Sequence, residues 1–112
     1  MAKMKTYEQI ILEVLNAEKI ERSTDQVKDL VLADKDSRHY QLLRTGWETN
    51  EYFVNKIIFH FHLSDNEKIW LLANNTDIPI TDELIKRGVP ISDIVLGFHP
   101  EKYRAYSGFA VH

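Results

Sequence analysis

The chain has 112 residues, 44% of them hydrophobic and 28% charged, which is the size and composition of one ordinary globular domain with a core. It contains no cysteine, which excludes disulfide bridges, cysteine-based zinc fingers and thiol nucleophiles. The first residues, MAKMKTYEQIILEV, lack the uninterrupted apolar core of a signal peptide, and no apolar run approaches membrane-spanning length. We therefore expect a cytoplasmic protein that does not enter a membrane.

The formal net charge is −3, and the acidic excess lies in residues 23–80. Proteins that bind nucleic acid usually carry a basic stripe, because neutralised phosphates supply most of their non-specific affinity. No such stripe is visible, so direct DNA binding is disfavoured. Folding could still gather a local basic patch from Lys86, Arg87, Lys102 and Arg104.

The N-terminal segment has the spacing of an amphipathic helix. Its apolar residues recur at i, i+3, i+4, i+7 and i+8 as Tyr7, Ile10, Ile11, Val14 and Leu15. Thr6 and Gln9 fit a capping box at its start. The pattern predicts a helix from Thr6 to about Glu21 that lies on a sheet.

Two strands are predicted after a polar break at residues 23–26. The first spans Val27–Asp34, and its apolar residues divide into Leu30 and Leu32 on one face and Val27 and Val31 on the other. A polar turn at residues 35–38 leads into the second strand, His39–Trp47. Such a short connection makes the two strands antiparallel, because a parallel crossover needs about a dozen or more residues.

The longest apolar region, Glu51–Asn74, predicts a long β-hairpin. Asp65 and Asn66 tolerate positive φ and can form its two-residue turn. This register pairs Leu63 with Lys68, Phe61 with Trp70 and Phe59 with Leu72. One face then carries Phe53, Ile57, Phe59, Phe61, Leu63, Trp70 and Leu72, and the other carries Ile58, His60, His62, Ile69 and Leu71. A three-residue turn would exchange the faces of the second strand.

The remainder of the chain predicts short elements and a docked tail. Thr81 is a candidate N-cap of a short helix that Gly88 and Pro90 would end. A second helical turn is expected from Ser92-Asp93 onward, carrying Ile94, Val95 and Leu96. The aromatic tail should cover part of the sheet or a partner through Phe98, Tyr106 and Phe109.

These elements predict a single α+β domain over residues 1–112. Its fold would be a four-stranded antiparallel β-meander with the long N-terminal helix packed on one face and a short helix plus an ordered C-terminal tail. One helix covers only one face of a sheet, so the second face, with Ile58, Ile69 and Leu71, must be closed by the C-terminal segment or by another subunit. We therefore expect a homo-oligomer or a hetero-oligomer.

His60 and His62 stand two apart on one strand, which points both imidazoles the same way at about 6–7 Å. A third ligand could complete a metal site with them, and His39 and His99 are candidates. Two histidines on a partly wet sheet face explain the pattern equally simply. No metal and no cofactor is expected, with His60 and His62 the weak candidates.

Asp77, Asp82 and Glu83 could suggest a hydrolase or nuclease. A turn aspartate and acids at a helix start explain all three, since acids complement the helix dipole. The sequence has no Gly-rich phosphate loop, nucleophile elbow or HExxH motif. We therefore expect no catalytic residues and no enzyme activity.

The candidate partner surface lies between Gly88 and Arg104. Charge and aromatic rings are offered there by His99, Lys102, Tyr103 and Arg104. The competing interpretation is that the glycine and proline residues end a helix and that the apolar residues only fill the core.

Several short blocks, taken in order, resemble those of the XisI family, the fdxN-element excision controlling factors of cyanobacteria. The blocks are His39-Tyr40-Gln41-Leu42-Leu43, Gly46-Trp47-Glu48, Lys68-Ile69-Trp70, Thr76-Asp77, Glu83-Leu84, Gly88-Val89-Pro90, residues 93–99 (DIVLGFH), Arg104 and Phe109-Ala110-Val111. Each block is weak alone, but their order and spacing are specific. The chain departs from the family pattern at Leu72, where a polar residue is common, and at its last residue, His112.

The resemblance implies a non-enzymatic regulatory factor that a site-specific recombinase needs to excise a DNA element during heterocyst development. Members of the family commonly accompany XisH, a protein whose fold resembles nucleases, and no catalytic residue carries over from them. The expected partner is thus an XisH-like protein or a recombinase complex. Two alternatives remain open at this stage: the controlling subunit of a two-component system with a nuclease-like partner, and a small metal- or ligand-binding domain that uses His60 and His62.

Overall fold

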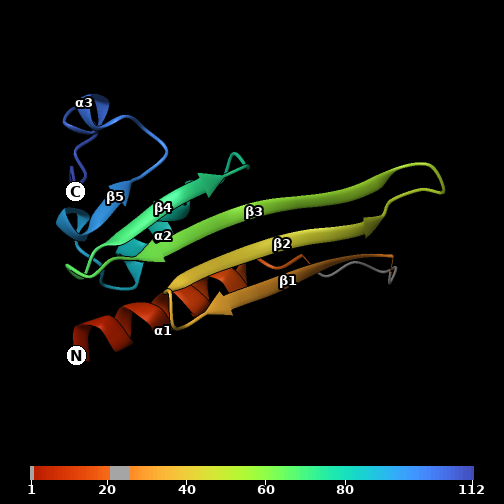
Figure 1. Cartoon of the computed structure of the whole chain (residues 1–112), viewed down its shortest axis with the longest axis horizontal. Coiled ribbons are helices and arrows are strands. Elements are labelled where there is room, and N and C mark those ends of the chain that lie inside the picture. The colour runs from red at the N-terminus through yellow and green to blue at the C-terminus, as the bar shows by residue number, and fades with distance from the viewer. Residues whose placement is uncertain (1, 21–25) are drawn as a thin grey trace.

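The computed structural model describes residues 2–20 and 26–112. Its sheet has the strand order β1-β2-β3-β4-β5, in which β1 to β4 are antiparallel neighbours and β5 runs parallel to β4 (Figure 1). The elements in chain order are α1 (Ala2–Ala17), β1 (Val27–Asp34), β2 (His39–Trp47), β3 (Phe53–Leu63), β4 (Ile69–Asn74), α2 (Ile80–Lys86), the 3-10 turn η1 (Ile91–Asp93), β5 (Ile94–Leu96) and α3 (Glu101–Arg104).

The predicted α+β class with an antiparallel meander is confirmed, and β1 and β2 have the predicted bounds. The predicted strand count of four is wrong, because Ile94–Leu96 forms a fifth strand instead of a helical turn. Only the turn η1 just before it is helical. Two of the three residues of β5 are β-branched, and the strand pairs with Ile69–Leu71, so tertiary pairing decides the conformation of a segment too short to specify its own.

The turn of the β3–β4 hairpin has three residues, so the predicted two-residue turn is wrong. Ser64 pairs with Lys68 through an N–H···O bond of 2.9 Å, and Glu67 has a φ of 63°. A loop of this length commonly ends in a residue in the left-handed region, which is the role of Glu67.

The longer turn exchanges the faces of β4. The observed pairs are Leu63 with Ile69, His62 with Trp70 and Phe61 with Leu71. Ile69 and Leu71 are therefore buried in the core, whereas Trp70 and Leu72 share the opposite face with the histidines. The predicted pairs of Leu63 with Lys68, Phe61 with Trp70 and Phe59 with Leu72 are all wrong.

A bulge in β3 also interrupts the simple alternation of side chains between the two faces of the sheet. The β2–β3 register shifts between Leu42 and Leu43, so that Leu42 faces Phe59 while Leu43 faces Ile57. Ile58 lies at this extra position and is buried, although alternation places it on the far face. Phe53, predicted on the core face, is half exposed near the end of the hairpin.

Helix α1 begins one turn earlier than predicted. Thr6 lies inside the helix, so the predicted capping box with Gln9 is wrong. The helix ends at Ala17, so the predicted end at about Glu21 is wrong, because residues 18–20 are no longer helical. The polar break predicted at residues 23–25 lies outside the described residues. The predicted apolar stripe is confirmed, since its members are all buried: Tyr7, Ile10, Ile11, Val14 and Leu15.

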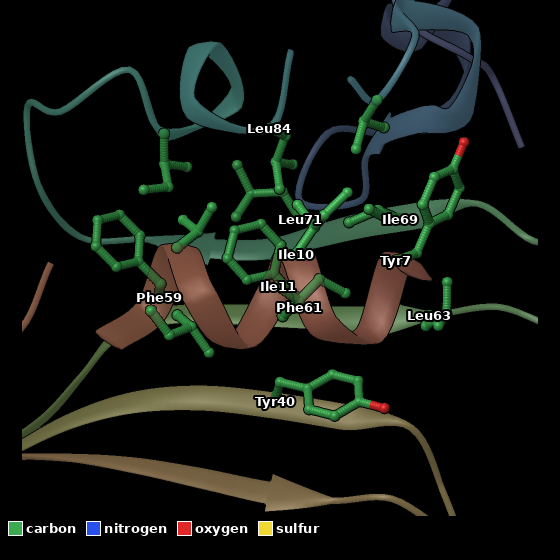
Figure 2. Packing of buried hydrophobic residues seen from close by; sticks show 14 of the residues in the cluster. Tyr7, Ile10, Ile11, Tyr40, Phe59, Phe61, Leu63, Ile69, Leu71 and Leu84 are labelled. Atoms are coloured by element: carbon green, nitrogen blue, oxygen red, sulfur yellow. The ribbon is translucent and has the colours of Figure 1, made fainter. Parts of the chain in front are cut away.

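The core lies between this stripe and one face of the sheet. Figure 2 shows α1 against the strands that carry Phe59, Phe61 and Ile69, with Leu84 of α2 completing the layer. Each such side chain contributes about 1.5–3 kcal/mol when it is fully buried. Two tyrosines at its edge donate hydrogen bonds of 2.5 Å, Tyr7 to Asp93 and Tyr40 to Glu8. They attach α1 to η1 and to β2.

Helix α2 ends as the sequence predicts but begins differently. Gly88 has a φ of 99°, and the N–H groups of Gly88 and Val89 donate to the carbonyls of Ile85 and Leu84 at 3.0 and 3.1 Å. These two bonds form a Schellman motif, which requires the left-handed residue. The predicted N-cap Thr81 lies inside the helix, which follows Pro79 without a side-chain cap.

Helices α1 and α2 both contribute to the core cluster, which lies on one face of the sheet. Neither of these two helices covers the opposite face. This far face carries Leu30, Leu32, His39, His60, His62, Trp70 and Leu72. Ile58, Ile69 and Leu71, which the sequence places there, are in the core. The far face is thus more polar than predicted.

Candidate functional site

Three histidines meet on the far face, where β2 and β3 run side by side. His39 and His62 are register partners, and their rings stack with centroids 4.2 Å apart. His39 Nδ1 lies 2.9 Å from His60 Nε2. The sequence predicts that His60 and His62 point the same way, and the register of β2 on β3 adds His39 to them.

The hydrogen bonds around His39 and His60 assign a neutral tautomer to each of these two rings. Gln41 Nε2 lies 3.5 Å from His60 Nδ1, so this nitrogen accepts and the Nε2–H of His60 donates to His39. His62 Nδ1 donates to the carbonyl of Arg38 at 3.0 Å. Burial, followed by the charge of His62, lowers the pKa of His39, and burial followed by the charges of His39 and His62 lowers the pKa of His60. A proton on His39 therefore disfavours a proton on His60.

Within residues 2–20 and 26–112, no group of three or more histidine, cysteine or carboxylate side chains has the arrangement of a metal site. The contact between His39 Nδ1 and His60 Nε2 joins a donor to an acceptor, and Gln41 contacts the second nitrogen of His60, so both nitrogens of His60 are engaged by the protein. His99, the other candidate ligand, contacts the ring of Phe98 instead. Nothing in the arrangement therefore favours metal binding over a packed histidine cluster.

Among the acidic residues near α2, Glu83 has structural partners. Glu83 accepts from Arg87 at 3.0 Å and from Lys86 at 3.2 Å within its own helix. These hydrogen bonds lower the pKa of the Glu83 carboxyl. Asp82 and Glu83 lie in the first turn of α2, where negative charge suits the helix dipole.

The C-terminal segment forms a second surface at the other end of the molecule from the β2–β3 loop (Figure 1). It comprises β5, the loop to α3, α3 itself and the tail to His112. Exposed rings gather in it, with 56% of Tyr103 and 87% of Tyr106 accessible. Phe109 packs against the core as predicted, whereas Phe98 is half exposed and Tyr106 is largely exposed.

Arg104 holds this segment in place. Its Nε donates to the carbonyl of His99 and its Nη1 to the carbonyl of Val111, both at 3.0 Å. Its guanidinium lies over the ring of Trp70, 4.9 Å from the centroid, which attaches the segment to the far face of β4. The indole N–H of Trp70 has no acceptor among the described residues, so packing and the cation hold this ring.

Of the four predicted partner-surface residues, three remain available to a partner. His99, Lys102 and Tyr103 are exposed, and the Lys102 ammonium lies 5.1 Å from the centre of the Tyr103 ring. Arg104 is instead committed to the two carbonyls and to Trp70, so it positions the surface from within.

A family model described as XisI protein matches residues 1–111. The chain belongs to the XisI family. It resembles the crystal structure of a XisI-like protein from Anabaena variabilis ATCC 29413, with a TM-score of 0.86 and 29% identity over 97% of this chain and 99% of that chain. It also resembles the fdxN element excision controlling factor XisI from the same organism, with a TM-score of 0.79 and 29% identity over 98% of this chain and 99% of that chain. A comparison with curated proteins gives no match.

The predicted family is therefore confirmed, and the XisI fold accounts for nearly the whole chain, including the three histidines and the C-terminal surface. No helix in the described part of this XisI protein is long and apolar enough to cross a membrane. The partner-surface residues stay a prediction.

Proposed function

We propose that this XisI-family chain is a non-enzymatic accessory factor that controls excision of a DNA element by a site-specific recombinase, and that it acts through protein contacts. The name of the second Anabaena structure, an fdxN element excision controlling factor, supports the regulatory role. Such a role is exercised in the cytoplasm, where the chromosome lies.

The observation that supports a role through protein contacts is the exposed aromatic surface around α3. Tyr103 and Tyr106 are large rings on a short element that Arg104 fastens to the sheet, and Lys102 adds a positive charge beside them. Tyrosine is enriched at the centres of protein interfaces, where its ring adds area and its hydroxyl finds a partner. A fixed surface also loses little entropy on binding.

The expected occupant of this surface is an XisH-like protein with a nuclease-like fold or the recombinase complex. The acidic net charge argues against the chain holding DNA by itself, because the affinity for phosphates comes from clustered basic groups. A second copy of the chain is a further expected partner, on a different surface.

The test is calorimetric titration of the chain into an XisH-like protein encoded beside it. Tyr103→Ala and Tyr106→Ala together should weaken binding by at least about tenfold, because a buried tyrosine at an interface contributes about 1–2 kcal/mol or more. The matched control is Tyr52→Ala, because Tyr52 is 60% exposed but belongs to the β2–β3 loop. This loop lies at the opposite end of the molecule (Figure 1).

If Tyr52→Ala weakened binding and the double variant did not, the interface would lie at the opposite end of the molecule. That result would reject the surface around α3 as the binding site. If the isolated chain were retained on DNA and released as the salt concentration rises, it would bind DNA directly. That result would reject the proposal that the chain acts through protein contacts alone.

A further inference from the structure

Strand β1 has a free edge. It is the first strand in the sheet order, and only β2 lies beside it among the described residues. Its register on β2 is continuous from Val27 to Asp34, with no bulge, and the strand contains neither proline nor glycine. Natural proteins usually protect an edge with prolines, bulges or charged side chains. Of these devices β1 has only its charged residues, Lys28, Asp34 and the inward-pointing Asp29, and they leave its backbone groups open to pairing with another strand.

The direction of its backbone groups follows from one hydrogen bond. Trp47 N–H donates to the carbonyl of Gln26 at 2.9 Å, so Gln26 faces β2 and every second residue after it does the same. The residues between them, including Val31 and Ala33, direct their N–H and C=O groups toward the open edge. A strand that pairs antiparallel there must bond to these residues.

The sequence of β1 is complementary to itself. In an antiparallel pair of two copies centred on Val31, Leu30 lies opposite Leu32 of the second copy, and Lys28 lies opposite Asp34 of the second copy. All four side chains are exposed on the far face, with Leu30 at 41% and Leu32 at 44%. They occupy the non-hydrogen-bonded positions, where side chains approach most closely.

Neighbouring registers lack this match. Centring the pair on Leu30 places Lys28 opposite Leu32 of the second copy, and centring it on Leu32 places Leu30 opposite Asp34 of the second copy. Centring the pair on Asp29 places Asp29 against its own copy and Lys28 against a leucine. Centring it on Ala33 places Leu32 opposite Asp34 and Leu30 opposite Asp36 of the second copy. Only the register about Val31 sets both leucines opposite leucines and Lys28 opposite Asp34, which is the condition for a specific edge pair.

We propose that two copies of this chain associate through their β1 edges, antiparallel about Val31, and so form one continuous sheet. The two-fold axis is perpendicular to the sheet, so both α1 helices lie on one side and the leucines of both copies form a strip on the other. This inference specifies the surface for the self-association named under the proposed function. Its test is separate from that of the aromatic surface, because the variants lie on β1.

The experiment measures molar mass by light scattering and sedimentation over a concentration series. The variants Leu30→Glu/Leu32→Glu and Leu30→Lys/Leu32→Lys place like charges opposite each other and should raise the dimer dissociation constant by at least about tenfold. The matched control Leu30→Lys/Leu32→Glu loses the same leucines but places opposite charges across the axis. It should dimerise more tightly than either like-charge variant, and salt should reduce the difference.

The absence of cysteine permits a check of the register. Leu30→Cys/Leu32→Cys should cross-link two copies under mild oxidation, because positions 30 and 32 of opposite copies face each other at about 4.5 Å between Cα atoms. Each single substitution should cross-link poorly. A wild-type mass that stays monomeric at hundreds of micromolar, or like-charge variants that dimerise as the wild type does, would overturn the proposal, and circular dichroism confirms that each variant is folded.

Discussion

Asp29 is the only buried charged side chain among the described residues, and Arg44 explains how it is tolerated. Arg44 donates to both of its carboxylate oxygens, from Nε at 2.8 Å and from a terminal nitrogen at 3.0 Å. The backbone N–H of Ile20 donates to the same carboxylate at 2.8 Å. The group thus joins β1, β2 and the chain that follows α1.

Arg44→Met should destabilise the chain by about 3–5 kcal/mol, because the Asp29 carboxylate would stay buried without its cation. That loss is a large part of the stability of a small domain, about 5–15 kcal/mol. Urea denaturation followed by circular dichroism measures it. The control Lys86→Met breaks an exposed pair with Glu83 and should cost far less, because water screens the two charges. Equal losses in the two variants would contradict the structural role of Arg44.

The Asp29–Arg44 pair could have been predicted from the sequence. The predicted strands and the short turn between them place Asp34 opposite His39, and the same register brings Asp29 opposite Arg44. The signal that was missed is the position of Asp29, which lies on the same face of β1 as Val27 and Val31. A carboxylate buried on that face needs a cation on the neighbouring strand. By contrast, the role of Arg104 depends on a docked tail whose path no local pattern specifies.

The elements show which local signals suffice. Helical and alternating patterns predicted α1 and the four long strands, because each buries a continuous apolar face. The β3–β4 turn was predicted one residue too short, since Asp65 and Asn66 suit a tight turn while Glu67 gives no sign of its positive φ. That single residue exchanged the faces of β4 and moved Trp70 beside the histidines.

The histidine cluster on β2 and β3 should make stability depend on pH. The pKa values of His39 and His60 are lowered below 6.5 in the folded chain, chiefly by burial. As the pH falls, the unfolded chain binds protons first, so the full stability is present above pH 6.5 and is lost as the pH falls through the folded-state values. Thermal melts between pH 7.5 and pH 5 should therefore show a falling melting temperature.

His60→Gln tests this origin of the pH dependence. Glutamine does not titrate, so the variant should lose part of the slope of melting temperature against pH below 6.5, whatever its effect at pH 7.5. A slope equal to that of the wild type would show that the cluster does not cause the pH dependence.

At the scale of the whole molecule, the sequence correctly predicted a helix on one face of a meander and an ordered tail. It could not predict how β5 and the tail extend the sheet beyond β4, because those contacts join residues distant along the chain. Ala110 N–H donates to the carbonyl of Ile94 at 2.8 Å, and Lys68 at the hairpin donates to the last carbonyl at 2.5 Å. The tail therefore closes the edge that β5 would leave open, and β1 is the edge strand with no second strand beside it among the described residues.

Arg104→Ala should release this tail without unfolding the rest. The variant loses two charge-assisted hydrogen bonds and the contact with Trp70, about 2–3 kcal/mol of local stability. The amide of Ala110 should then exchange with solvent about 30–100 times faster, while amides of β2 and β3 keep their protection, because a terminal segment opens independently of the core. Hydrogen exchange by NMR measures both. Lys102→Ala, which removes a neighbouring exposed cation, should leave the Ala110 amide unchanged, and equal exchange in both variants would mean that Arg104 does not hold the tail.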